Sequence, residues 1–123
     1  MNLLGIIKAG LAAGLLINLS QYSLNTMVLQ VPRETLTFWV AYGFALGFLV
    51  AWFYAWMLTR GWDSGARTSI LAGGIIWFVA GGLNAAFMGY HVIGVFWTLA
   101  DMVVAGILAG GLYREPEALP AGD

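Results

Sequence analysis

Four apolar runs, separated by short polar breaks, set the strongest limit on how this chain can fold. A helix of roughly 20 predominantly apolar residues crosses the hydrocarbon core of a bilayer. Membrane β-strands would show alternating segments of about ten residues instead of continuous runs. The sequence therefore predicts an all-α bundle of four transmembrane helices over residues 1–114, followed by a short polar tail at 115–123. The expected spans are about Ala9–Leu29, Thr37–Thr59, Ser69–Gly89 and Val92–Tyr113.

Composition agrees with this reading and excludes several classes of protein. The chain is 61% hydrophobic and 9% charged, whereas a soluble domain carries about 25% charged residues. With a net charge of −1 the chain offers no basic face for nucleic acid, so the expected partner is the lipid bilayer. Because there is no cysteine, disulfides, thiolate nucleophiles and cysteine-rich metal sites are absent.

Basic residues at the ends of the expected spans predict the orientation of the chain. Only Arg33 falls on one side of the membrane, and the other basic residues fall on the opposite side, at Lys8, Arg60, Arg67 and Arg114. Basic residues are retained on the cytoplasmic face of a membrane. Both termini are therefore expected to be cytoplasmic.

The two halves of the chain resemble each other. Aligning Asn25 with Asn84 pairs "AG" at 13–14 with "AG" at 72–73. In the second span of each half, "AWMLTR" at 55–60 is matched separately with "AGGLYR" at 109–114. Each half holds two spans, so both halves insert the same way round. The alignment predicts two tandem helical hairpins related by a pseudo-twofold axis along the membrane normal. The alternative is that a duplicated hairpin simply makes a stable bundle.

Glycine pairs at a spacing of four residues predict where the helices touch. They occur in "GLAAG", "GFALG" and "GILAG". In lipid, small residues let two backbones approach closely, and this contact replaces the hydrophobic driving force. The six glycines expected at helix contacts are Gly10, Gly14, Gly43, Gly47, Gly106 and Gly110.

Amide side chains add a polar stripe to the first span. Asn18, Gln21 and Asn25 recur at spacings of three and four and so share one helix face. Asn84 in the third span lies at a depth similar to that of Asn25, which predicts a hydrogen bond between the two. Amides that hold helices together, at about 0.6 kcal/mol each, are favoured over substrate binding.

Asp101 is the acid that lies deep in an apolar run, "FWTLADMVVAG". A charged aspartate at the centre of a transmembrane helix costs at least about 2.5–3.5 kcal/mol, which favours the neutral acid. A neutral Asp101 could donate a hydrogen bond to Asn18 or Gln21 and join the first helix to the fourth. This structural role is preferred over proton coupling, because no second acid or base accompanies it.

Three segments together resemble an uncharacterised family of small bacterial four-helix integral membrane proteins. They are "AGLAAGLLINLSQYSLN" at 9–25, "GFALGFLVAWFYA" at 43–55 and "ILAGGLYREP" at 107–116. The resemblance implies the fold and a place in the bacterial inner (plasma) membrane, and it implies no activity. Members often carry Gly-Glu where this chain has Ser20 and Gln21, so a second intramembrane acid is missing here.

No catalytic constellation is present, and we expect the protein not to be an enzyme. The single histidine, His91, is a weak candidate for holding a metal or pigment, and a solvated turn residue is the preferred reading. The sequence identifies no cofactor. The preferred function is an accessory or interaction subunit of a membrane assembly, formed with other subunits or by self-association.

Two alternatives stay open. One is a small oligomeric transporter, which would have to use Asp101 for proton coupling. The other is a bundle that binds a lipophilic ligand such as a lipid, a quinone or a pigment.

Overall fold

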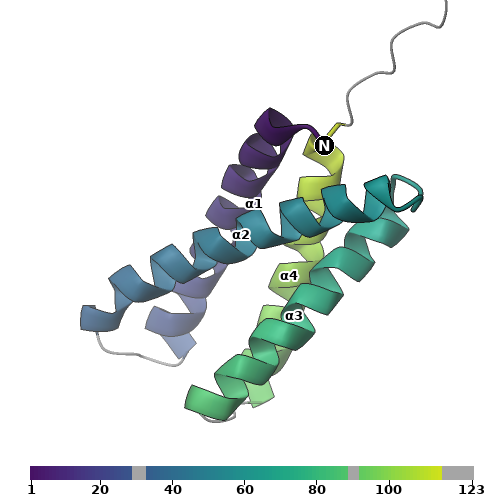
Figure 1. Ribbon diagram of the computed structural model, residues 1–123. Helices are drawn as coiled ribbons and strands as arrows, with labels where there is room; N and C mark the ends of the chain where they lie inside the picture. Colours follow the sequence, from purple (N-terminus) through teal and green to yellow (C-terminus); the bar gives the residue numbers. More distant parts are fainter. Residues whose placement is uncertain (29–32, 89–91, 115–123) are drawn as a thin grey trace, which may run out of the picture.

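The computed structural model is a bundle of four α-helices joined by short connections (Figure 1). It describes residues 1–28, 33–88 and 92–114, without the side chains of Asn25, Val28, Arg33, Val92 and residues 82–88. In chain order the elements are α1 (Leu3–Ser23), the π-helical segment η1 (Leu24–Val28), the 3₁₀ segment η2 (Arg33–Thr35), α2 (Leu36–Thr59), α3 (Ala66–Met88) and α4 (Val92–Leu112). The predicted all-α bundle is confirmed.

The length and apolarity of the helices are those of a membrane protein. Leu3–Ser23, Leu36–Thr59 and Ile93–Leu112 are each long and apolar enough to cross a membrane. In α3 the residues with described side chains form a shorter apolar stretch, Ala66–Gly81. The fold is therefore that of a helical membrane bundle with three helices of spanning length in its described part.

The first helix begins at Leu3, ahead of the expected start at Ala9. The reason is a cap that the search for apolar residues overlooked. Asn2 is extended, and its side-chain oxygen accepts a hydrogen bond from the backbone N–H of Gly5 at 3.0 Å. This bond satisfies a donor that the first turn of a helix leaves unpaired. Lys8 is consequently an exposed residue inside the helix.

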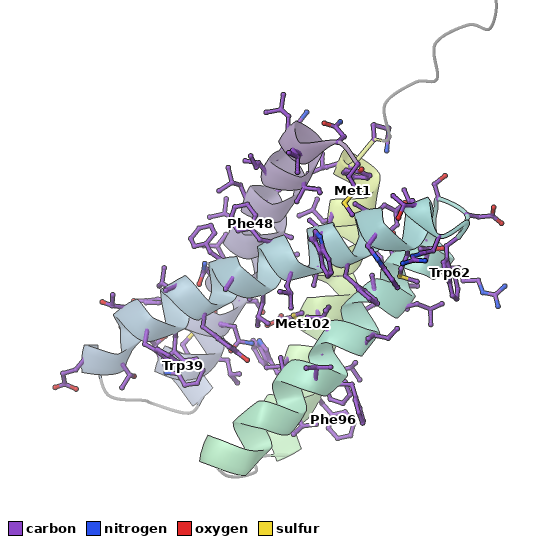
Figure 2. The ribbon with its side chains drawn as sticks, in the orientation of Figure 1. Met1, Trp39, Phe48, Trp62, Phe96 and Met102 are labelled. Atoms are coloured by element: carbon purple, nitrogen blue, oxygen red, sulfur yellow. The ribbon has the colours of Figure 1, made fainter. Side chains whose placement is uncertain are left out.

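Each hairpin is closed by a glycine contact between its two helices. In the first hairpin α1 and α2 cross obliquely (Figure 1). A side chain at Gly47 of α2 would collide with the backbone of Gly14 and with the carbonyl oxygen of Gly10 on α1. A Cβ atom at Gly10 or Gly14 would likewise meet Phe48 or Phe44, and Figure 2 shows Phe48 beside α1.

The second hairpin repeats this contact at the positions that the internal alignment pairs with the first. A Cβ atom at Gly106 of α4 would collide with the carbonyl oxygen of Ser69 on α3 and lie 3.3 Å from the backbone of Gly73. In the register that pairs Asn25 with Asn84, Gly47 pairs with Gly106, Gly14 with Gly73, and Gly10 with Ser69. The separate match of "AWMLTR" with "AGGLYR" lies five residues out of this register and is wrong, because the glycine crossings follow the Asn25–Asn84 register. At this crossing the two hairpins are therefore built alike, as expected of a pseudo-twofold repeat.

A seam of small residues and two tyrosines lies where the hairpins meet. The rings of Tyr54 and Tyr113, which the alignment also pairs, meet edge to face with centroids 6.1 Å apart. Around them the alanines are fully buried, at Ala9, Ala13, Ala51, Ala55, Ala72, Ala105 and Ala109. Small side chains let helices approach closely in lipid, so this seam holds the centre of the bundle.

The tyrosine hydroxyls tie each hairpin to the start of the other. Tyr54 of α2 accepts a hydrogen bond from the backbone N–H of Gly65, which precedes α3, at 3.3 Å. Tyr113, which follows α4, accepts one from the backbone N–H of Asn2 at 2.9 Å. The N-terminus, the α2–α3 connection and the end of α4 consequently lie at one end of the bundle. In that connection Gly61 and Gly65 take positive φ angles of 92° and 139°, which suit glycine.

Candidate functional site

A cluster of four polar side chains joins α1 to α4 around Asp101. The amide nitrogen Nε2 of Gln21 donates a hydrogen bond to Oδ2 of Asp101 at 2.8 Å. The hydroxyl of Ser20 donates to Oδ1 of the same carboxyl group. Trp97, one turn before Asp101 on α4, donates from its indole Nε1 to Oγ of Ser20 at 2.9 Å. The cluster thus forms a continuous hydrogen-bonded chain from Trp97 through Ser20 to Asp101 and Gln21.

Both carboxyl oxygens of Asp101 accept hydrogen bonds in this cluster, and the side chain is 9% exposed. The sequence-based expectation that Asp101 donates is wrong, because the partner atom of Gln21 is an amide nitrogen and can only donate. The joining of α1 to α4 through Asp101 is the arrangement that was expected, with the direction of the hydrogen bond reversed.

Asn18 does not take part in the cluster, contrary to the expectation that it could pair with Asp101. Its side chain lies against α2, where a Cβ atom at Gly43 would meet its amide group. The Nδ2 atom of Asn18 is buried and has no hydrogen-bond partner among the described residues. Asn18 and Gln21 lie on the same broad face of α1, and on that face Asn18 contacts α2 while Gln21 contacts α4.

Ser20 and Trp97 are the members of the cluster that sequence reasoning missed as polar partners. Ser20 lies outside the stripe defined by spacings of three and four residues, although it directly precedes Gln21. Adjacent residues on a helix are about 100° apart, so Ser20 and Gln21 can each donate a hydrogen bond to a different oxygen of one carboxyl group. A signal was present in the pairing of Trp97 with Asp101 at a spacing of four, which places them on one face.

The six glycines expected at helix contacts all lie against a neighbouring helix. Gly10, Gly14, Gly43 and Gly47 lie at the α1–α2 crossing. Gly106 lies against α3, and a Cβ atom at Gly110 would meet Ser69 of α3 and Tyr54 of α2. These glycines therefore shape the scaffold that carries the polar cluster.

Three other candidates fall outside the described part of the chain. The side chains of Asn25 and Asn84, which were expected to pair, are not described, and neither is His91. Among the described residues no three His, Asp or Glu side chains come together in a way that could hold a metal ion.

A cavity lies beside the polar cluster and is lined by all four helices. Its walls include Gln21 of α1, Trp39 and Tyr42 of α2, Trp77 of α3 and Thr98 of α4. Figure 2 labels Trp39 and Met102, which lie on its α2 and α4 sides. The volume open to the centre of a water-sized sphere is about 40 Å³. Since one water needs about 10–15 Å³ on this measure, the cavity holds about three to four water-sized groups.

The residues that the repeat places opposite the polar cluster are apolar or aromatic. The alignment pairs Ser20 with Val79, Gln21 with Ala80, Asp101 with Tyr42 and Trp97 with Phe38. Val79 is 55% exposed and Phe38 59% exposed, so this second interface, between α2 and α3, is the more open one. Among the described side chains, this Asp–Ser–Gln–Trp cluster is therefore found at one of two equivalent places.

The fold and the site together define a helical membrane protein built from two like hairpins, with one intramembrane polar cluster. Comparison of the chain with protein-family models, with curated proteins and with solved structures gave no match. Function is therefore inferred from the geometry of the bundle.

Proposed function

We propose that this protein is a non-catalytic membrane subunit that works by associating with further transmembrane helices, in a second copy or in another membrane protein. The observation that carries this proposal is a pair of helical glycines, Gly74 on α3 and Gly111 on α4. A Cβ atom at either position would meet no atom of the described residues within 4 Å. The contacts among these residues do not account for glycine at the two places.

Glycine at an uncontacted helix position needs a reason because it weakens a helix by about 1 kcal/mol relative to alanine. In lipid, a glycine on a helix surface lets another helix approach. Gly111 is exposed and Gly74 is half-buried. A helix from outside the chain that packs over these positions would supply the missing contact.

The small polar surface of the chain supports the same proposal. The connection between α2 and α3 covers only residues 60–65, which leaves little polar surface there for a soluble partner. Association through the apolar helix surfaces is then the main kind of contact that the chain offers. Many large apolar side chains face outwards, among them Leu15, Leu19, Trp52, Phe78 and Phe96.

The polar cluster favours this function over the alternative of a proton-coupled transporter. Both carboxyl oxygens of Asp101 are held by hydrogen bonds from α1. A proton relay needs a second group that exchanges the proton, and an intramembrane acid in a relay is usually one of a chain of titratable groups. Among the described residues Asp101 has no such companion, and its partners are a serine and an amide.

The proposed location is the bacterial inner membrane, with both termini in the cytoplasm. The support is the excess of basic residues at the end of the bundle where Asn2 lies beside Tyr113 and Arg114. Because the chain has no cysteine, single cysteines can be placed at Glu34, Ser64 and Glu117 and labelled from outside intact cells. Only the cysteine at Glu34 should react, and labelling at Ser64 would overturn the orientation.

Gly74→Leu and Gly111→Leu provide the test of association. Neither leucine meets an atom of the chain near its Cβ position, so each variant should fold and keep the melting temperature of the wild-type monomer in detergent. Native mass spectrometry of gently solubilised membranes should then show that the complex containing the wild-type chain is lost or weakened. Leu11→Ala, at an exposed position of α1 that lies on neither α3 nor α4, is the control and should leave the complex intact.

The proposal fails if the wild-type chain is monomeric in native membranes or nanodiscs. It also fails if both leucine variants assemble as the wild type does. A self-association is told from a hetero-complex by the mass of the complex, and either outcome supports the proposal.

A further inference from the structure

We propose that the cavity between the four helices is a binding site for a small alkylammonium cation. This site is separate from the helix surfaces proposed for association. Its chemistry follows from four features: aromatic walls, an unpaired amide oxygen, a neighbouring carboxyl group and a small volume.

Aromatic rings make up a large part of the wall. Trp39 and Tyr42 of α2 lie edge to face with ring centroids 5.9 Å apart. Trp77 of α3 is fixed at the wall because its indole Nε1 donates a hydrogen bond to the hydroxyl of Thr98 at 3.2 Å. Rings of tryptophan and tyrosine attract cations through their electron-rich faces, and ammonium ligands are the established use of such surroundings.

Gln21 supplies the polar end of the cavity. Its amide nitrogen is engaged by Asp101 at 2.8 Å, whereas its amide oxygen accepts no hydrogen bond from the described residues. An amide oxygen can only accept, so it calls for a ligand that carries N–H or O–H groups. The hydroxyl of Thr98 already donates to the carbonyl oxygen of Gly94 at 2.8 Å.

The carboxyl group nearby favours a cation over a neutral donor, because both of its oxygens accept hydrogen bonds and neither donates one, which is the bonding of a carboxylate rather than of the neutral acid expected from the sequence. Asp101 lies directly behind Gln21, and Thr98 and Met102 on the same helix line the cavity on either side of it. The basic residues with described side chains, Lys8, Arg60, Arg67 and Arg114, lie at the opposite end of the bundle. In surroundings of low dielectric constant, one carboxyl group in contact with the wall contributes strongly to the local field.

The volume of the cavity and the difference between its two opposite walls restrict the class of ligand further. A cavity of about 40 Å³ holds about three to four water-sized groups, which suits a short alkyl chain with one ammonium group. Across the pseudo-twofold axis, Ala80 stands where Gln21 would be, and it lines the opposite wall. The ammonium group therefore lies at the Gln21 wall, and the alkyl chain lies against Ala80 and the rings.

Binding of propylammonium to the purified full chain in nanodiscs tests the proposal. Propan-1-ol is the matched neutral probe, because it has the same number of heavy atoms and also donates a hydrogen bond. The readout is the melting temperature as a function of probe concentration, with sodium chloride at equal ionic strength as the blank. We expect saturable stabilisation by propylammonium and a dissociation constant at least about tenfold lower than that for propan-1-ol.

Variants separate the cavity from non-specific binding. Asp101→Asn keeps the shape of the side chain and removes its charge, and Trp77→Phe keeps an aromatic ring and removes the indole. Each should raise the dissociation constant for propylammonium by about tenfold or more. Trp52→Phe changes a ring that is 46% exposed and does not line the cavity, and it should leave the dissociation constant unchanged.

Three results would overturn the proposal. The first is no saturable binding of propylammonium to the wild type, and the second is equal affinity for propylammonium and propan-1-ol. The third is an unchanged affinity in Trp77→Phe. The affinity of Trp77→Phe for propylammonium tests the proposal even if Asp101→Asn fails to fold.

Discussion

The two interfaces between the hairpins occupy equivalent places in the repeat, and they are built differently. At the α1–α4 interface Ser20 and Gln21 donate hydrogen bonds to Asp101, and Trp97 donates one to Ser20. At the α2–α3 interface the equivalent positions hold apolar or aromatic residues, and two of them, Val79 and Phe38, are more than half exposed. The polar cluster closes one interface, and the other interface stays more open.

This difference separates what builds the fold from what gives the molecule a site. The glycine crossings within the hairpins and the tyrosines at their ends come in pairs, as expected of elements that every copy of a hairpin needs. Among the described residues the Asp101 cluster and the Gln21 wall of the cavity occur once. The duplicated features thus build the scaffold, and the polar site is not duplicated with them.

The largest expected effect comes from the paired glycines. Gly47→Leu and Gly106→Leu each force a side chain into the backbone of a neighbouring helix, and overpacking of this kind costs about 1–3 kcal/mol or more. Equivalent crossings should lose similar amounts, measured as the free energy of unfolding in a detergent mixture. If one variant is as stable as the wild type, the two crossings are not equivalent and the repeat is not a structural one.

A smaller effect is expected at the unpaired cluster. Asp101→Ala leaves the hydroxyl of Ser20 and the amide of Gln21 without their partner, and an unpaired buried group costs about 1–3 kcal/mol. Asp101→Asn keeps an oxygen that can accept and should recover most of the stability. At the equivalent place on the other interface, Val79→Ala removes an exposed side chain and should cost less than about 0.5 kcal/mol.

The smallest effect should appear at the tyrosine hydroxyls. Tyr54→Phe and Tyr113→Phe each remove one hydrogen bond to a backbone N–H and keep the edge-to-face contact of the rings. Each should lower the free energy of unfolding by about 0.5–1.5 kcal/mol. The shorter bond, from Asn2 to Tyr113 at 2.9 Å, should give the larger loss of the two.

Much of this architecture could be predicted from the sequence because it depends on features with a regular spacing. The apolar runs predicted the helices, and the glycine pairs pointed to residues that lie at helix contacts. The start of α1 was misplaced because one capping side chain, Asn2, decides it. A pattern of apolar residues does not reveal a polar side chain that caps the helix ahead of it.

The site was only partly predictable, because helix periodicity places residues on a face without choosing their neighbours. Asp101 and Gln21 were on the correct faces, and the crossing angles of the helices decided that Ser20 rather than Asn18 completes the pair. The cavity depends on the splaying of four helices and on rings such as Trp39 and Trp77. Those contacts arise from tertiary packing, which no spacing within one helix can specify.

The central claim is that one of two equivalent interfaces is held by a polar cluster, and a pair of double-mutant cycles tests it most directly. The first cycle combines Gln21→Leu with Asp101→Leu, and the control cycle combines Val79→Ala with Phe38→Leu at the other interface. Interhelical hydrogen bonds in membrane proteins give coupling free energies of about 0.6–1.7 kcal/mol. We predict a coupling of this size between Gln21 and Asp101 and none beyond error between Val79 and Phe38. Zero coupling in the first cycle, or equal coupling in both, would contradict the account.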